Sequence, residues 1–369
     1  MSSATPAAPI AHDAHHTVAD LDEAALIAIL VNACPTRPPP EGPGDDAALL
    51  RPTPRARALT TDALVEGTHF LRAHPPRSLG WKALAVNLSD VAAMGAVPEA
   101  FVLAMALPPD LPLAYLRAFA QGLGAYARMH GVHLAGGDTV RANGPLMVSV
   151  TAWGEVMASP SGLLPEAMGS PSGLLPEAPA DRLLRRSGGR PGDLLMVAGP
   201  IGRAGHGLDL WLAAHPAPHA AWAAPDAIPH DINLLEQHLQ PTPPLWAGPW
   251  ALAHGATAGM DLSDGLATDL PRLAQASDLV LEVDLDRLPE DDLLGDLDPR
   301  VRAAHGEDYG LVVLVPPEHA AAFTAQGFVT IGQAGRERIE SPLPAPDRVL
   351  WRVAGRVVPP VAATFSHFR

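Results

Sequence analysis

Short segments in which aspartate stands beside glycine, serine or threonine recur along this chain. They are Gly44–Ala48 (GDDAA), Thr60–Asp62 (TTD), Asn87–Asp90 (NLSD), Gly136–Thr139 (GGDT) and Asp261–Gly265 (DLSDG). Each segment alone is typical of a turn or a helix cap. Together they supply hard oxygen donors of the kind that Mg²⁺ prefers, and such ions neutralise a phosphoryl group during transfer. The pattern predicts magnesium-dependent phosphate chemistry.

The surroundings of three of these segments strengthen that interpretation. Thr60–Asp62 ends an apolar stretch, where a loop facing a substrate would start, and Asp261 directly follows an apolar run that ends at Met260. Asp90 lies in a helical pattern next to Val91 and other apolar residues. A carboxylate near an apolar face is costly unless it is paired or binds a metal. We therefore expect these aspartates to converge on ions.

The elements that must position these residues alternate between strands and helices. Alternating apolar residues predict strands near 58–61 and 146–153, and 3.6-residue periodicity predicts helices over 79–94 and 111–129. A short helix over 20–31 precedes them. In the second half, we expect a strand into Asp261, a helix from Leu266 and a strand after Tyr309. This alternation favours an α/β (α+β) fold.

The length and the charge narrow the classes of protein. A chain of 369 residues predicts two domains, and the net charge of -15 argues against a nucleic acid or an anionic membrane as a partner. The apolar run over 24–31 is too short to span a bilayer. The N-terminus has no basic region, which argues against a secretory signal. Cys34 is the single cysteine, which fits a reducing compartment and ordinary packing. We expect a cytoplasmic protein.

Lys82 is the only lysine of the chain, and it excludes one kinase class. It lies in Leu79-Gly80-Trp81-Lys82, outside the glycine frame that a phosphate-binding P-loop needs. If the chain is a kinase, it is not a P-loop kinase.

Composition also predicts the boundaries of the domains. Residues 1–18 are rich in alanine, proline and histidine and are expected to form a disordered tail. Ser159–Ala167 and Ser170–Ala178 both read SPSGLLPEA, which indicates a duplicated surface insertion over 157–180 at the domain junction. The expected domains are 19–156 and 181–369.

The ordered motifs resemble those of thiamine-monophosphate kinases, from about residue 41 to the C-terminus. Besides the aspartate segments, the resemblance rests on Val65–Phe70 (VEGTHF), Trp81–Ala96 (WKALAVNLSDVAAMGA), Arg186–Gly188 before Pro191–Asp193, and Gly306–Tyr309 (GEDY). That family is similar to aminoimidazole ribonucleotide synthetase, selenophosphate synthetase and a hydrogenase maturation protein. The resemblance implies an aminoimidazole ribonucleotide synthetase-like fold. In that fold the N-terminal α/β domain, here 19–156, binds ATP and magnesium and pairs across a homodimer, and a second α/β domain follows.

The resemblance also implies roles for individual residues. The magnesium ligands would be Asp46, Thr60, Thr61, Asp62, Asp90, Asp138, Asp261 and Asp264. The contacts to ATP would come from Gly137, Asp138, Arg186 and Ser263, and those to thiamine monophosphate from His69, Glu307 and Phe365.

Simpler explanations exist for four of these residues. Arg186 could be a solvated member of an arginine-rich segment, and His69 a satisfied core histidine. Glu307 could form a structural ion pair, and Phe365 could be a packing anchor.

The family motif Gly-Gly-Glu-Asp-Tyr-Glu is altered here, because His305 replaces the first glycine and Gly310 the final glutamate. No tyrosine near Gln121 matches the family's adenine contact.

The implied activity is ATP-dependent phosphorylation of thiamine monophosphate to thiamine pyrophosphate, the last step in making that compound. The substrate's phosphate oxygen would attack the γ-phosphorus of ATP in line. Because that oxygen is already anionic near neutral pH, no general base is required. Two alternatives stay open: another ATP-dependent synthetase of the same group, such as aminoimidazole ribonucleotide synthetase, and a nucleotide-binding maturation or scaffold protein without turnover.

Overall fold

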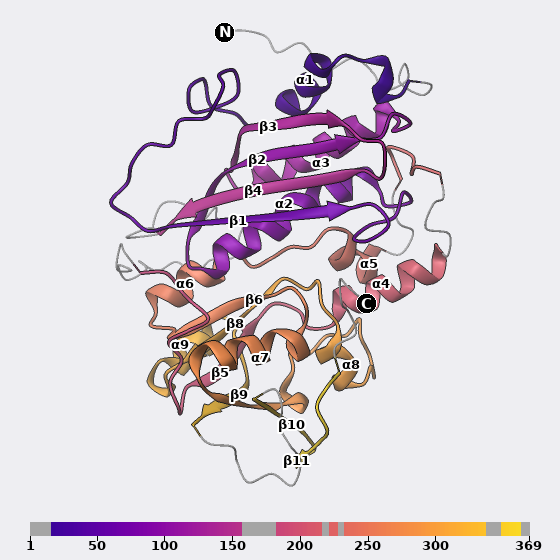
Figure 1. Cartoon of the computed structure of the whole chain (residues 1–369). Coiled ribbons are helices and arrows are strands. Elements are labelled where there is room, and N and C mark those ends of the chain that lie inside the picture. Colours follow the sequence, from indigo (N-terminus) through magenta and orange to yellow (C-terminus); the bar gives the residue numbers. More distant parts are fainter. Residues whose placement is uncertain (1–15, 157–181, 216–220, 228–231, 337–347, 363–369) are drawn as a thin grey trace.

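The structure is a computed structural model, and it describes residues 16–156, 182–215, 221–227, 232–336 and 348–362. Most of the expected tail, the repeat at 157–180 and Phe365 lie outside the described residues. Within the described ranges, each half of the chain forms one sheet with its own helices (Figure 1). This arrangement confirms the α/β (α+β) class.

The sheet of the N-terminal half has the strand order β1-β4-β2-β3. Its strands are β1 (Arg57–Val65), β2 (Val97–Leu107), β3 (His133–Arg141) and β4 (Met147–Glu155). The strands β2 and β3 are parallel, whereas β4 is antiparallel to both β1 and β2. The expected strands near 58–61 and 146–153 are β1 and β4. Strand β2 was not predicted, because Phe101–Leu107 is apolar throughout and shows no alternation, although only every second side chain is fully buried.

Two long helices cover one face of this sheet. They are α2 (Pro76–Ala93) and α3 (Leu113–Met129), and both were expected. Their axes approach closely because glycine lies at the contact: a Cβ on Gly80 would stand 2.0 Å from the Phe119 carbonyl oxygen. The helix α1 (Glu23–Ala33) packs against α3 and β3 and ends at the buried Cys34. The described chain begins beside α3, where Val18 donates its N–H to the Leu111 carbonyl.

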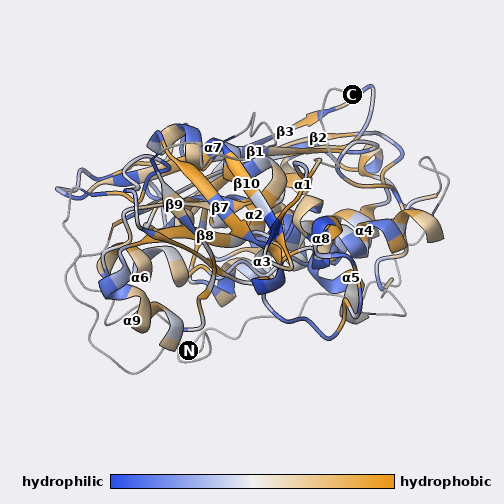
Figure 2. Ribbon diagram, turned by 90° about the horizontal axis from the view of Figure 1, so that it is seen from below, coloured by the Kyte–Doolittle hydropathy of each residue, from blue (hydrophilic) through white to orange (hydrophobic). Residues whose placement is uncertain are grey.

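The sheet of the C-terminal half has the order β11-β10-β7-β9-β5-β8-β6. Its strands are β5 (Leu194–Ala198), β6 (Ala258–Leu262), β7 (Val280–Asp284), β8 (Gly310–Val315), β9 (Val329–Gly335), β10 (Val349–Val353) and β11 (Arg356–Val357). The strand β8 is buried along its whole length and coloured as hydrophobic in Figure 2. The expected strands into Asp261 and after Tyr309 are β6 and β8, which pair with each other.

Helices and short 3-10 turns complete the C-terminal half. The helices are α4 (Arg203–Ala214), α5 (Ile232–Leu239), α6 (Ala247–Ala253), α7 (Leu266–Ser277), α8 (Pro299–Ala304) and α9 (Ala320–Ala325). The 3-10 turns of the described chain are η2 (Val18–Asp20), η4 (Leu285–Arg287) and η5 (Pro317–His319). Helix α2 runs along the boundary between the halves and contacts α5, α6 and β6. Every helix of the described ranges is too short or too polar to span a membrane.

Candidate active site

A pocket with a volume of about 500 Å³ lies between the two halves. It contains seven of the residues that the sequence predicted for the site: Asp62, His69, Asp90, Asp261, Ser263, Asp264 and Glu307. They come from β1, from the loop after it, from α2, from β6 and the turn between β6 and α7, and from the segment before β8. The fold therefore gathers motifs as far apart in the chain as Asp62 and Glu307.

Helix α2 orients the aspartates of its neighbours. The Thr60 hydroxyl on β1 donates a hydrogen bond of 2.7 Å to the Asp90 carboxylate. The side-chain oxygen of Asn87 accepts the backbone N–H of Asp62 at 3.0 Å, and the Ser89 hydroxyl donates to Asp261 at 3.2 Å. The motif Asn87–Asp90 thus ties both β1 and β6 to one turn of helix.

Negative charge in this pocket is only partly compensated. Asp261 is 4% exposed, and burial together with the charges of Asp90 and Asp269 raises its pKa well above the ordinary value. Burial also raises the pKa of Asp90, against the opposing effects of the Thr60 hydrogen bond and of Arg186. Arg186 is exposed and acts on this cluster through its charge. A cation bound among these carboxylates would relieve their repulsion.

The donors suit magnesium that is carried by phosphates. Within the described ranges, no three acidic, histidine or cysteine side chains converge closely enough to hold an ion by themselves. Mg²⁺ in nucleotide sites is usually held by one or two carboxylates together with waters and phosphate oxygens. Asp62, Asp90 and Asp261 offer such carboxylates in the lining of the pocket. The chemistry of the donor set therefore fits an ion brought in with a nucleotide.

Asp264 is already paired with an arginine in the structure. Arg272 on α7 lies 2.6 Å from the Asp264 carboxylate and 2.9 Å from that of Asp269. Asp269 is fully buried and accepts the Asp264 N–H at 2.9 Å, so it fixes the turn that carries Asp264. Burial and the charge of Asp264 raise the pKa of Asp269 to about 7.

Glu307 forms the ion pair that was considered as the simpler explanation of its role. Its two carboxylate oxygens lie 2.9 Å from Lys82 Nζ and 2.8 Å from His238 Nδ1. Burial alone would raise the pKa of Glu307, but these two partners bring it below the ordinary value. Glu307 nevertheless lines the pocket, so the ion pair and a place at the site coexist.

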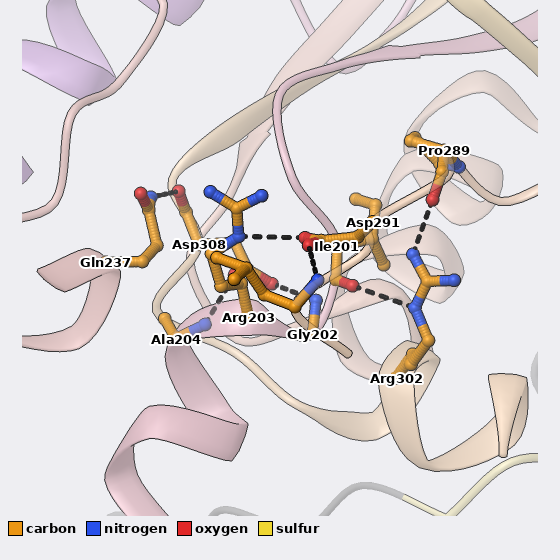
Figure 3. Close-up of polar contacts among 10 residues, drawn as sticks. Ile201, Gly202, Arg203, Ala204, Gln237, Pro289, Asp291, Arg302 and Asp308 are labelled. Atoms are coloured by element: carbon orange, nitrogen blue, oxygen red, sulfur yellow. Dashed lines mark hydrogen bonds and ion pairs between the residues drawn. The ribbon is translucent and has the colours of Figure 1, made fainter. Parts of the chain in front are cut away.

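Asp308, the residue after Glu307, is hydrogen-bonded to α4 and α5 (Figure 3). Its carboxylate accepts the backbone N–H groups of Gly202 at 2.5 Å and Ala204 at 2.8 Å, at the first turn of α4. Gln237 on α5 donates to the Asp308 carbonyl at 2.7 Å. One buried residue thus joins α4 and α5 to the strand that follows Glu307. Burial raises the pKa of Asp308 to about 7.

His69 has one ring nitrogen engaged by the backbone. Its Nδ1 accepts the N–H of Val65 at 3.1 Å, so the neutral ring carries its proton on Nε2. The ring lines the pocket and can offer that N–H to a phosphate oxygen. The altered residue His305 is buried in the wall beside α4, with Nε2 3.3 Å from Asp209.

Asp46, Gly137 and Asp138 lie in a second cavity, of about 550 Å³, at the β3 edge of the N-terminal sheet. Asp138 pairs with Ala104, which pairs with Ser149, which pairs with Ala63 on β1. Three strand spacings, or about 14 Å, therefore separate Asp138 from β1. The structure does not bring these three residues into the pocket that holds Asp62 and Asp90.

The two neighbouring threonines also differ. Thr60 faces α2, whereas the Thr61 hydroxyl donates to the Val150 carbonyl and accepts from Thr151.

Four residues of the junction pocket or its supports had no predicted role: Lys82, His238, Asp269 and Asp308. Asp308 stood inside the quoted Gly306–Tyr309 motif, so a signal for it existed. Lys82 stood inside the quoted Trp81–Ala96 motif and served as evidence against a P-loop, but it was given no role of its own. His238 and Asp269 carry no local pattern that separates them from ordinary helix residues.

Comparisons with known proteins identify the family of the chain. The chain matches the family models of the AIR synthase related protein, with the N-terminal domain over 44–156 and the C-terminal domain over 190–338. The thiamine-monophosphate kinase of Salmonella typhimurium (strain LT2) is 37% identical over 300 residues, which cover 80% of this chain and 81% of that protein.

Two solved structures are similar along most of the chain. The thiamine-monophosphate kinase of Stenotrophomonas maltophilia K279a has a TM-score of 0.66 and 32% identity, and the match covers 86% of this chain and 91% of that one. The Aquifex aeolicus protein AaThiL, complexed with AMPPCP and TMP, has a TM-score of 0.64 and 27% identity, covering 94% and 98%. On the identity and coverage of the Salmonella protein, this chain belongs to the thiamine-monophosphate kinase family.

Proposed function

We propose that this chain transfers the γ-phosphoryl group of ATP to thiamine monophosphate and so makes thiamine pyrophosphate, with Mg²⁺ as the cofactor. The observation that carries the proposal is the pocket between the halves. Asp62, Asp90 and Asp261 line it, and so do Ser263 and Glu307. The related AaThiL structure contains AMPPCP and TMP, and AMPPCP is an analogue of ATP.

The reaction needs little from the protein beyond position and charge. The terminal phosphate oxygen of thiamine monophosphate is anionic near neutral pH and can attack the γ-phosphorus directly. The bond to the β–γ bridging oxygen then breaks, and ADP leaves. Orientation of the two reactants and neutralisation of their charge lower the barrier. No side chain has to remove a proton from the nucleophile.

The residues divide into three proposed groups. Asp62, Asp90, Asp261 and Asp264 would hold magnesium, which supplies positive charge at the phosphoryl group in transfer. Arg186 and Ser263 would contact the phosphates of ATP, and His69 would donate from Nε2 to the monophosphate. Glu307 would line the substrate side of the pocket. Asp46, Gly137 and Asp138 stay proposed ligands of metal and nucleotide from the cavity at the β3 edge, and Thr60 acts through Asp90.

We also propose that the chain is a cytoplasmic homodimer that catalyses the last step in making thiamine pyrophosphate. The dimer proposal rests on the face of the N-terminal sheet opposite α2 and α3. Leu59 is 71% exposed there, and Val140 and Met147 are 50% and 37% exposed. Such an apolar sheet face is suited to pairing with a second copy across a twofold axis.

The first experiment measures ADP and thiamine pyrophosphate with purified protein, ATP and Mg²⁺, with and without thiamine monophosphate. We expect one thiamine pyrophosphate for each ADP, and no ADP release above background without the acceptor. Omission of Mg²⁺ with added chelator should abolish both products. If the protein binds ATP but forms no product from thiamine monophosphate, the proposed function is wrong, and the chain has another activity of the same fold.

A further inference from the structure

Lys82 is buried in the middle of α2, with 1% of its surface exposed. Its Nζ atom lies 2.9 Å from Glu307 Oε1, so an ammonium from the N-terminal half is paired with a carboxylate from the C-terminal half. A buried charge of either sign is costly without its partner, and the geometry of such a pair is therefore tightly held.

A second contact holds the other oxygen of Glu307. His238 on α5 lies 2.8 Å from Oε2, and its own pKa is lowered by burial and by Lys82. The Glu307 carboxylate is thus fixed between α2 and α5, with its charge already balanced by Lys82. It is not available as a free counter-ion or as a metal ligand.

The backbone connects Glu307 to the acidic turn of the site. Its N–H donates to the Ser263 carbonyl at 2.7 Å, and the N–H of Tyr309 donates to the Leu262 carbonyl at 2.9 Å. Glu307 and Tyr309 have φ angles of 67° and 51°, a region that residues other than glycine seldom adopt. This segment therefore keeps its shape only while the surrounding contacts hold it.

Helix α2 uses the same face for two further contacts with the C-terminal half. The Trp81 indole N–H donates to the Pro241 carbonyl at 2.9 Å, and the Ser78 hydroxyl accepts from Gln240 at 3.0 Å. Lys82 lies between these contacts and the aspartates near the end of the helix. At this interface, Lys82 is the charged side chain of α2 that contacts the pocket residue Glu307 directly.

We propose that Lys82 is a positioning residue of the active site. From α2 it fixes the carboxylate of Glu307, and through that segment it sets the wall of the pocket against which thiamine monophosphate binds. The inference rests on the proposed function, because it names the substrate side of the same pocket. Lys82 does not touch the reacting atoms.

The test is a double-mutant cycle with Lys82→Met, Glu307→Gln and the double variant. Arg352→Met is the control, because Arg352 pairs with Glu282 at the far side of the C-terminal sheet. Calorimetry gives the Kd of thiamine monophosphate and of AMPPCP without requiring turnover. Steady-state kinetics give kcat and both KM values, and thermal unfolding gives the midpoint.

For Lys82→Met, we expect the Kd and KM of thiamine monophosphate to rise about tenfold or more because the wall is displaced. The AMPPCP Kd should stay within about threefold, since Asp62 and Asp90 keep their own contacts. The thermal midpoint should fall by on the order of 5 °C, because the Glu307 carboxylate keeps its contact with His238 but loses the charge of Lys82 that balances it. In the double variant, the midpoint should recover while the Kd of thiamine monophosphate stays high.

Recovery of both the midpoint and the Kd in the double variant would overturn the inference, because the pair would then be purely structural. An unchanged Kd in folded Lys82→Met would overturn it as well, as would an equal effect of Arg352→Met. If Lys82→Met does not fold, two other variants decide the question by the Kd of thiamine monophosphate. They are the double variant and His238→Gln, which removes one of the two side-chain contacts of Glu307. If wild-type protein binds thiamine monophosphate but forms no product, the proposed function fails while the cycle of Kd values still tests Lys82.

Discussion

The hydroxyl of Thr60 and the carboxylate of Asp90 are joined by a hydrogen bond of 2.7 Å between β1 and α2. This contact places Asp90 beside the middle of β1, two residues from Asp62; the strand continues to Val65, so the loop expected at Thr60–Asp62 starts only after that residue. Asp261 reaches the same region through Ser89, one residue before Asp90. Two sequence motifs thirty residues apart and a third from the other half of the chain thus meet at one turn of a helix.

Asp90→Asn should remove most activity while the fold persists. The amide keeps the size of the side chain and can still accept from Thr60, but it loses the charge that a metal ion would need. We expect kcat to fall by about 10²-fold or more, as for the loss of one electrostatic contact to a transition state. Steady-state assays over a range of Mg²⁺ concentrations measure this effect.

Asp298→Asn is the matched control, because Asp298 caps α8 on the surface and lies outside the pocket. It should leave kcat unchanged. Circular dichroism and thermal unfolding should show both variants folded. Wild-type activity in Asp90→Asn would remove Asp90 from the metal-binding group.

The elements that carry the motifs could be predicted from sequence, but the contacts between them could not. Strands β1 and β4 lie in alternating apolar stretches, and helices α2 and α3 have long apolar patterns, so these four elements could be recognised. Helix α2 is buried on nearly every side, so its length and not an amphipathic period marks it. Strand β2 is apolar from Phe101 to Leu107, and β3 contains two adjacent glycines, so neither shows a period of two. Lys82 and Glu307 stand 225 residues apart, and no local pattern links them.

The same limit applies to the site. Sequence grouped Asp62, Asp90, Asp261 and Asp264, and the structure places these four in one pocket. Sequence also grouped Asp46 and Asp138 with them, whereas the structure puts that pair in a cavity at the β3 edge. The order of strands within a sheet depends on long-range pairing, which motif order does not encode.

Gly137→Ala should destabilise the N-terminal sheet, whereas Gly136→Ala should not. A Cβ on Gly137 would lie 2.0 Å from the Leu103 carbonyl oxygen, so β3 would have to move away from β2. A Cβ on Gly136 would meet Val102 at 4.0 Å, an ordinary contact. We expect Gly137→Ala to lower the free energy of unfolding by about 1–3 kcal/mol, as overpacking does.

Urea unfolding of the two alanine variants measures the difference. Nucleotide affinity, measured with AMPPCP, then tells whether Gly137 matters to binding beyond its place in the sheet. Equal stability of the two variants would contradict the close approach of β3 to β2. A weaker affinity in Gly137→Ala alone, at preserved stability, would indicate a direct role at the nucleotide.

The carboxyl group of Asp308 should make a pH-dependent contribution to stability. Burial raises its pKa to about 7 in the folded protein, against 3.8 as the ordinary value. The folded state therefore binds the proton more tightly, and this contribution is present in full below about pH 4 and is lost as the pH rises through about 7. The loss amounts to on the order of 2–4 kcal/mol.

Asp308→Asn isolates this contribution, because the amide does not titrate in that range. The free energy of unfolding of the wild type minus that of the variant should decrease between pH 4.5 and pH 8, on the order of the same 2–4 kcal/mol. Urea titrations of both proteins at several pH values measure the difference. A difference that is constant with pH, or that increases, would contradict a raised pKa of Asp308.

Leu59→Glu should separate the proposed homodimer. Leu59 lies on β1 with 71% of its surface exposed, on the sheet face opposite α2 and α3, and a charge there would be desolvated in a dimer formed through that face. We expect the wild type to have twice the mass of the chain in light scattering. In Leu59→Glu, the dissociation constant of the dimer should rise by a factor of about 10² or more, so that more of the protein is monomeric. Leu293→Glu, at another exposed leucine in the C-terminal half, should leave the dimer intact. If the wild type has the mass of one chain, the open face does not pair; if both variants stay dimeric, the contact lies elsewhere on the molecule.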